Sequence, residues 1–175
     1  MSTMPRPAAA AAAPILDSLT GIPSDQLFWH LLSNAVLRAE RQAHNLALLA
    51  IYVRGLSELN AAHGRDAGDA ALRVVAARLA GRLRRSDSIA RLAGTKFAVL
   101  AEALTEDADV QLLAEALIET LAEPIPTVDG DIRLAVSIGI ALYPRTADKP
   151  SALLAAAITA MDDAVAAGEN TYRLA

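Results

Sequence analysis

The segment from residue 132 to residue 142 restricts the possible folds more than any other part of the chain. Large apolar residues alternate strictly with other residues through it, and the large ones are Ile132, Leu134, Val136, Ile138, Ile140 and Leu142. Because successive side chains of a strand point to opposite faces, this pattern predicts a long strand with one bulky face and one face of mostly small residues. Residues 46–53 form a continuous apolar run, which predicts a central strand that is covered on both sides.

Other segments repeat their apolar residues at helical spacing. They predict helices over about residues 24–39, 56–62, 66–83, 108–121 and 151–167, with Ser24 and Asp66 as N-terminal caps. Two short segments, 88–92 and 96–101, flank a turn at Gly94 and predict a β-hairpin, and residues 171–174 predict a short closing strand. The order of these elements indicates an α/β (α+β) fold with a mixed, antiparallel-rich central sheet flanked by helices.

The composition excludes several classes of protein. The 175 residues include no cysteine, which excludes a disulfide scaffold and a thiolate metal site. A net charge of -4 and an aromatic content of 3% argue against binding to a nucleic-acid polymer. No apolar run approaches the roughly 20 residues that span a bilayer, so we expect no membrane contact from this segment. Residues 1–14, rich in Ala and Pro, predict a disordered leader before one domain over residues 15–175.

Four segments together carry a more specific pattern. They read D-S-L-T-G-I-P at residues 17–23, N-A-A-H-G-R-D-A-G-D at 60–69, R-R-S-D at 84–87 with A-G-T-K-F at 93–97, and V-S-I-G-I-A at 136–141. Their order and spacing resemble the GGDEF family, the diguanylate cyclases that join two GTP molecules into cyclic di-GMP. The resemblance extends over residues 17–173 and implies a βααββαβ core similar to the palm of nucleotide cyclases.

The positions that this resemblance aligns with the metal-binding acids of the family are not acidic. An acid at the end of the first strand and two acids of the signature hairpin correspond here to Tyr52, Thr95 and Lys96. Mg²⁺ prefers carboxylate oxygens, and a lysine ammonium repels it. No other carboxylate lies close in sequence to replace them. We therefore expect a degenerate diguanylate cyclase that is not an active enzyme and that holds no metal or other cofactor.

Two residues that recognise the guanine base in the family are retained. The resemblance places Asn60 and Asp69 at these positions, and an amide and a carboxylate can pair with the edge of guanine. Asn60 equally suits a turn, and Asp69 equally suits the first turn of a helix, where the macrodipole favours an acid. We therefore interpret the pair as a vestigial guanine-binding site.

The R-R-S-D segment resembles the R-x-x-D inhibitory site at which the family binds cyclic di-GMP. Arg84 can direct two N–H donors at guanine O6 and N7, and Asp87 can accept hydrogen bonds from guanine N1–H and the 2-amino group. Arg85 can add positive charge or contact a phosphate. The alternative is structural, because arginines are favourable at a helix C-terminus and an aspartate is common in turns. The helix predicted over 108–121 carries no Lys or Arg, so it lacks the further arginine that often completes this site in the family.

The leading hypothesis is therefore a catalytically inactive GGDEF domain that binds cyclic di-GMP through Arg84, Asp87 and Arg85. Such a domain would act in the bacterial cytoplasm as a second-messenger receptor or regulatory module. The alternative is a ligand-free structural domain that forms a homodimer, or that regulates an attached or partner module such as an EAL phosphodiesterase. Residual cyclase activity is a third possibility, which formation of cyclic di-GMP from GTP and Mg²⁺ would reveal.

Overall fold

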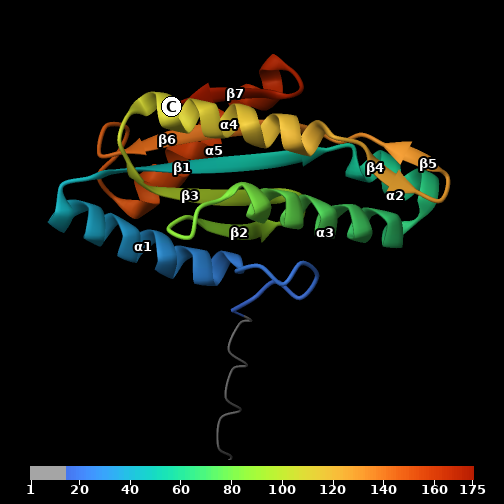
Figure 1. Ribbon diagram of the computed structural model, residues 1–175, viewed down its shortest axis with the longest axis horizontal. Helices are drawn as coiled ribbons and strands as arrows, with labels where there is room; N and C mark the ends of the chain where they lie inside the picture. Colours follow the sequence, from blue (N-terminus) through green and yellow to red (C-terminus); the bar gives the residue numbers. More distant parts are fainter. Residues whose placement is uncertain (1–14) are drawn as a thin grey trace, which may run out of the picture.

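The computed structural model describes residues 15–175, so the leader predicted over residues 1–14 lies outside the described residues. The helices and strands follow one another along the chain as shown in Figure 1. Their bounds are α1 Asp25–Gln42, β1 Asn45–Arg54, α2 Leu56–His63, α3 Arg65–Arg82, β2 Ser88–Ala93, β3 Lys96–Leu104, α4 Asp107–Ala122, β4 Ile125–Thr127, β5 Gly130–Ile132, β6 Ala135–Tyr143, α5 Pro150–Ala167 and β7 Thr171–Leu174.

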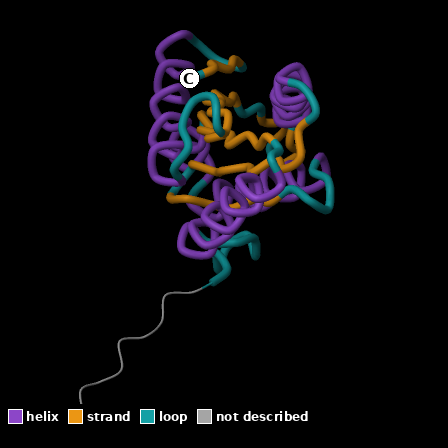
Figure 2. Tube along the Cα trace, turned by 90° about the vertical axis from the view of Figure 1, so that its left-hand side faces the viewer, coloured by secondary structure: helices purple, strands orange, loops and turns teal. Residues whose placement is uncertain are grey.

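Five of the strands form one sheet, in the order β2-β3-β1-β6-β7. Every neighbouring pair in it is antiparallel except β6 and β7, which run parallel. The strands β4 and β5 form a separate hairpin. Figure 2 shows helices on both sides of the strands. The structure thus confirms the predicted mixed, antiparallel-rich sheet flanked by helices.

The central strand β1 contributes to a hydrophobic core on each face of the sheet. Leu49 and Ile51 belong to the core that α2, α3 and α4 cover, whereas Leu48 and Ala50 belong to the core beneath α1 and α5. All four side chains are fully buried, because alternate residues of the strand point to opposite faces. This confirms the strand predicted from the apolar run at 46–53.

The small face of β6 lets α5 approach the sheet closely. A Cβ atom added at Gly139 would lie only 2.1 Å from the carbonyl oxygen of Ala157 and 2.1 Å from the amide nitrogen of Met161. By length and composition alone, the 18 residues of α5 could cross a membrane, which differs from the expectation that no run is long enough. Its buried residues, among them Leu153 and Met161, form one face that belongs to the core beneath α1 and α5.

Two details of the prediction are wrong. Asp66 does not cap α3: the cap is Gly64, and Asp66 lies in the first turn, where its charge interacts favourably with the helix dipole. The strand predicted over 132–142 is divided, because Ile132 pairs with Ile125 in the β4–β5 hairpin and β6 begins only at Ala135. Leu134 between them is also buried, so the alternation of apolar residues continues across the break.

Candidate functional site

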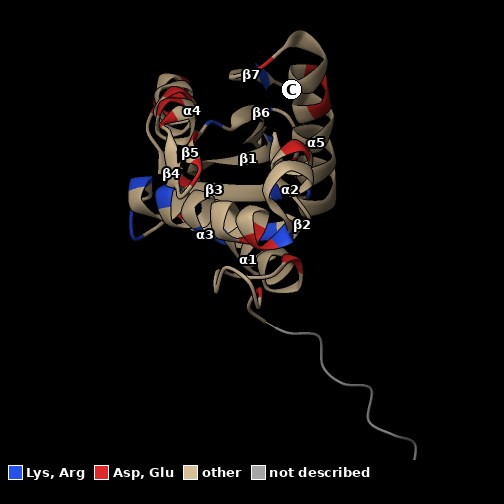
Figure 3. Ribbon diagram, turned by 90° about the vertical axis from the view of Figure 1, so that its right-hand side faces the viewer, with Lys and Arg blue, Asp and Glu red and all other residues tan. Residues whose placement is uncertain are grey.

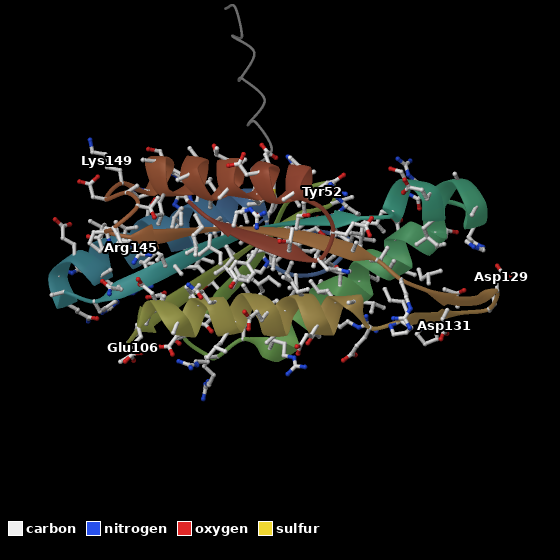
Figure 4. The ribbon with its side chains drawn as sticks, turned by 90° about the horizontal axis from the view of Figure 1, so that it is seen from above. Tyr52, Glu106, Asp129, Asp131, Arg145 and Lys149 are labelled. Atoms are coloured by element: carbon white, nitrogen blue, oxygen red, sulfur yellow. The ribbon has the colours of Figure 1, made fainter. Side chains whose placement is uncertain are left out.

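A cavity of about 610 Å³ opens where β1 ends, beside the C-terminal end of α5. Its lining comes from β1, α2, the β2–β3 turn and the end of α5, and comprises Tyr52, Val53, Arg54, Gly55, Leu56, Ser57, Glu58, Thr95, Val165 and Glu169. Figure 4 labels Tyr52 near that end of α5, while the tip of the β4–β5 hairpin, with Asp129 and Asp131, projects at one end of the molecule.

The fold brings together the three positions that the resemblance aligns with the catalytic acids of the family. Tyr52 pairs with Lys96 in the register of β1 and β3, and the amide of Val53 donates a hydrogen bond to the carbonyl oxygen of Thr95 at 3.0 Å. Tyr52 and Thr95 line the cavity, whereas Lys96 is not among the lining residues.

Arg54 connects this cavity to the end of α5. Its Nη2 donates a hydrogen bond to the carbonyl oxygen of Val165 at 2.6 Å. Val165 lies in the last turn of α5, where carbonyl groups have no partner within the helix and a positive charge is favourable. The last turn of α5 contains no basic residue of its own, so Arg54 supplies the cation.

The side chains at this cavity do not form the magnesium site that the resemblance implies. Two carboxylates, Glu58 and Glu169, line it together with the guanidinium of Arg54. Within residues 15–175, no group of three or more His, Cys, Asp or Glu side chains could hold a metal ion. A two-metal site needs several carboxylate oxygens, so the residues present do not fit one.

Asn60 and Asp69 lie where α2 meets α3. The side chain of Asn60 packs against Gly68, since a Cβ atom there would come within 2.0 Å of its Oδ1. The structure therefore places Asn60 beside the residue that precedes Asp69, but neither residue lines the 610 Å³ cavity.

Arg91 links the β2–β3 turn to Asp17, a residue that precedes α1. Nε of Arg91 donates to the carbonyl oxygen of Gly94 at 2.9 Å, and its Nη1 lies 3.2 Å from Oδ2 of Asp17. Asp17 also accepts hydrogen bonds from the amide and hydroxyl of Thr20, at 2.9 and 2.6 Å. Burial raises the pKa of Asp17, but the hydrogen bonds from Thr20 and the charge of Arg91 outweigh it and hold this pKa below its usual value.

The R-x-x-D segment forms part of a second, smaller hollow of about 60 Å³. It lies between the end of α3, strand β3 and the first half of α4, and its lining comprises Arg82, Arg84, Asp87, Ala101, Glu102, Leu104, Asp109 and Leu113. The fold thus brings Arg84 and Asp87 to one site. Arg85 is exposed and is not among the lining residues.

Asp87 stabilises the turn that follows α3. Its Oδ2 accepts a hydrogen bond from the amide of Arg84 at 2.9 Å, and its Oδ1 accepts one from the amide of Glu102 at 3.3 Å. Its own amide donates to the carbonyl oxygen of Arg84 at 3.0 Å. A carboxylate has about four acceptor sites, so each oxygen of Asp87 can still accept another hydrogen bond.

Two arginines that the motif does not reveal connect helices to other elements, and one of them, Arg38, pairs with a residue of this hollow. Arg38 of α1 donates two hydrogen bonds to Glu102, at 2.6 and 3.3 Å, and the Glu102 side chain is only 12% exposed. Arg78 of α3 donates to the carbonyl oxygens of Glu123 and Pro124, at 2.6 and 2.7 Å, just after α4 ends. No sequence pattern indicates these contacts, because the partners lie far apart along the chain.

The family model described as "Diguanylate cyclase, GGDEF domain" matches residues 14–171. The chain belongs to the GGDEF family. It is 41% identical over 160 residues to diguanylate cyclase TpbB from Pseudomonas aeruginosa, covering 91% of this chain and 37% of TpbB. A solved structure comprising only the GGDEF domain of TpbB has 40% identity and a TM-score of 0.88, and the match covers 91% of this chain and 94% of that chain.

A second relative belongs to a protein of two named activities. The bifunctional diguanylate cyclase/cyclic di-GMP phosphodiesterase MucR from Pseudomonas aeruginosa is 36% identical over 156 residues, which cover 89% of this chain and 23% of MucR. The chain thus spans about a third of TpbB and about a quarter of MucR.

The expectation that this domain is not an enzyme is contradicted by the similarity to TpbB, which is named a diguanylate cyclase. That expectation rested on three aligned positions and on the lack of a carboxylate close by in the sequence. The fold brings the carboxylates of Glu58 and Glu169 to the same cavity, and Glu169 comes from the far end of the chain. Two carboxylates do not complete a two-metal site, so the correction rests on the similarity to TpbB.

Proposed function

We propose that this GGDEF domain binds cyclic di-GMP at the hollow lined by Arg84 and Asp87, and acts as a second-messenger receptor or regulatory module in the bacterial cytoplasm. The observation that supports the proposal most directly is that Arg84 and Asp87 line one hollow. Within residues 15–175, the guanidinium of Arg84 has no hydrogen bond to another side chain or to the backbone, so its donors are available to a ligand.

The two side chains complement guanine in different ways. The guanidinium of Arg84 can donate to O6 and N7, and the free acceptor sites of Asp87 can receive N1–H and the 2-amino group. Adenine has neither of these two donors, so the site favours guanine. Arg85, which is exposed beside the hollow, can contact a phosphate from the rim.

The turn at Asp87 also lowers the cost of binding. Both oxygens of Asp87 are held by backbone amides, and one of these amides belongs to Arg84. The backbone that carries both ligand-binding residues is therefore fixed before the ligand arrives, and less conformational entropy is lost on binding.

Isothermal titration of the 175-residue chain with cyclic di-GMP tests the proposal. Arg84→Ala is expected to weaken binding by roughly 5- to 150-fold, the equivalent of about 1–3 kcal/mol for a bidentate guanine contact. Asp87→Asn keeps an acceptor oxygen for the amide of Arg84 but loses the hydrogen bond from the amide of Glu102, so it should weaken binding and lower the thermal stability modestly. Cyclic di-AMP should bind far more weakly than cyclic di-GMP.

Arg65→Ala is the matched control, since Arg65 begins α3 and lies about 26 Å along the helix from Arg82. This variant should keep the wild-type affinity. No heat with the wild-type chain at tens of micromolar ligand, or wild-type affinity in both site variants, would refute the proposal.

A second candidate function is regulation of an attached or partner domain without a ligand, including through a homodimer. It is favoured by the relatives named phosphodiesterases: MucR, and NbdA from Pseudomonas aeruginosa, which is 33% identical and of which the chain spans 20%. Sedimentation velocity distinguishes the two candidates. A stable dimer that is unchanged by cyclic di-GMP and by Arg84→Ala supports this second function.

A further inference from the structure

The hollow contains one more arginine than the R-x-x-D motif accounts for. Arg82, the last residue of α3, lines it together with Arg84. Nε of Arg82 donates a hydrogen bond to the hydroxyl oxygen of Thr120 at 2.6 Å, and Thr120 is a buried residue of α4. This bond fixes the orientation of the guanidinium. The two terminal nitrogens of Arg82 have no hydrogen bond within residues 15–175.

The facing helix α4 supplies no positive charge to this site. Its residues Asp107–Ala122 include acids but neither Lys nor Arg, and Figure 3 shows the acidic positions in red along it. Cyclic di-GMP carries two negative charges, so a site for it needs cations beyond a single arginine. Of the residues that line the hollow, only Arg82 and Arg84 are basic.

The polar side chains of the hollow differ in how far the protein satisfies them. Glu102 is paired with Arg38, and Asp87 accepts two backbone amides. Asp109 accepts hydrogen bonds from the amides of Thr105 and Glu106, at 3.3 and 3.2 Å, in the capping box of α4. All three carboxylates therefore already have donors.

The guanidinium groups stand in contrast to these carboxylates, because the protein leaves the Arg84 side chain and both Nη atoms of Arg82 without acceptors in the described part of the chain. Unpaired donors at a hollow favour a ligand that presents acceptor oxygens. A planar guanidinium with two adjacent Nη groups suits two phosphate oxygens.

We propose that Arg82 is a second ligand-binding arginine of this site, that its Nη groups contact a phosphodiester of cyclic di-GMP, and that Thr120 is its positioning residue. This assignment rests on the proposed function. Arg84 then recognises a guanine and Arg82 neutralises a phosphate, so α3 supplies the cation that α4 lacks.

The test compares dissociation constants of Arg82→Gln, Arg82→Lys, Thr120→Val and Arg84→Ala at about 0.05 and 0.2 M salt, with Arg65→Gln as the charge-matched control. Arg82→Gln should weaken binding roughly 10-fold or more at low salt, as for a lost charge-assisted hydrogen bond, and should flatten the dependence of affinity on salt. Arg82→Lys should restore the salt dependence but only part of the affinity.

Thr120→Val removes the acceptor of Nε and should weaken binding less than Arg82→Gln, with little change in melting temperature. Wild-type affinity and salt dependence in Arg82→Gln, together with loss of binding in Arg84→Ala, would overturn the role of Arg82 and leave the proposed function intact. Absence of binding by the wild-type chain would overturn both. Equal losses of affinity in Arg65→Gln and Arg82→Gln would show a general effect of net charge and would also overturn the assignment.

Discussion

Replacing Gly139 by alanine tests the packing of α5 on the sheet. The added Cβ would lie 2.1 Å from two backbone atoms of α5, those of Ala157 and Met161, and 2.7 Å from the carbonyl carbon of Ala160. Ordinary contacts of a Cβ atom begin at about 3.4 Å, so β6 and α5 must separate by more than 1 Å. Because the obstructing atoms belong to the backbone, no side-chain rotation relieves the clash.

Overpacking a core costs about 1–3 kcal/mol, and a clash with backbone belongs at the upper end. For a domain of this size, 1 kcal/mol corresponds to about 2–4 °C, so Gly139→Ala should lower the melting temperature by roughly 6–12 °C. Thermal unfolding followed by circular dichroism measures this shift, and the urea midpoint provides an independent value.

The control for this substitution is Gly81→Ala in α3. A Cβ atom at Gly81 meets no atom within 4 Å, so the same chemical change occurs there without a clash. It should raise stability by about 0.5–1 kcal/mol, because alanine favours the helix over glycine. A Gly139→Ala variant that melts within 2 °C of the wild type would refute the close packing of α5 on β6.

Three further substitutions test other contacts. Asp17→Asn should lower the free energy of unfolding at neutral pH and make it fall less steeply in acid. The pKa of Asp17 is lower in the folded than in the unfolded chain, so its charge stabilises the fold at a pH above the unfolded pKa. This contribution is lost as the pH falls below about 4. Urea unfolding at pH 7 and pH 3 measures this effect. A difference in free energy of unfolding between variant and wild type that is as large at pH 3 as at pH 7 would contradict the prediction. Arg78→Ala removes two hydrogen bonds to carbonyl groups beyond α4 and should cost about 1–2 kcal/mol in urea unfolding; an unchanged midpoint would refute it. Arg38→Met leaves the largely buried Glu102 unpaired and should cost about 1–2 kcal/mol, and adding Glu102→Gln should recover part of the loss.

The fold follows from the sequence wherever burial has a regular period. The run at 46–53 and the alternation through 132–142 predict the two strands that form the middle of the sheet. The same alternation hides the break before Ala135, because Ile132 at the end of β5 is partly buried and Leu134 between the two strands is buried. Periodicity records which side chains are buried and does not identify the strand with which each residue pairs.

The 610 Å³ cavity and the R-x-x-D hollow differ in how well the sequence predicts the residues that line them. Arg84 and Asp87 lie three residues apart, and a turn stabilised by Asp87 fixes their relation, so a local motif identifies them. The 610 Å³ cavity draws its lining from segments as distant as Glu58 and Glu169. Its charge depends on the tertiary fold, which aligned positions alone do not give, and the expectation about activity is corrected by the similarity to TpbB.

The distribution of charge explains how an acidic domain can accommodate an anionic ligand. The net charge of -4 would repel cyclic di-GMP if it acted uniformly, but charges that are already paired contribute little at short range. At the R-x-x-D hollow, each carboxylate is held by a donor of the protein, and the guanidinium groups of Arg82 and Arg84 remain available. Affinity for an anion at this site therefore depends on which charges the fold leaves unpaired, and an Arg38→Met variant that frees the Glu102 carboxylate should weaken binding although Arg38 does not line the hollow.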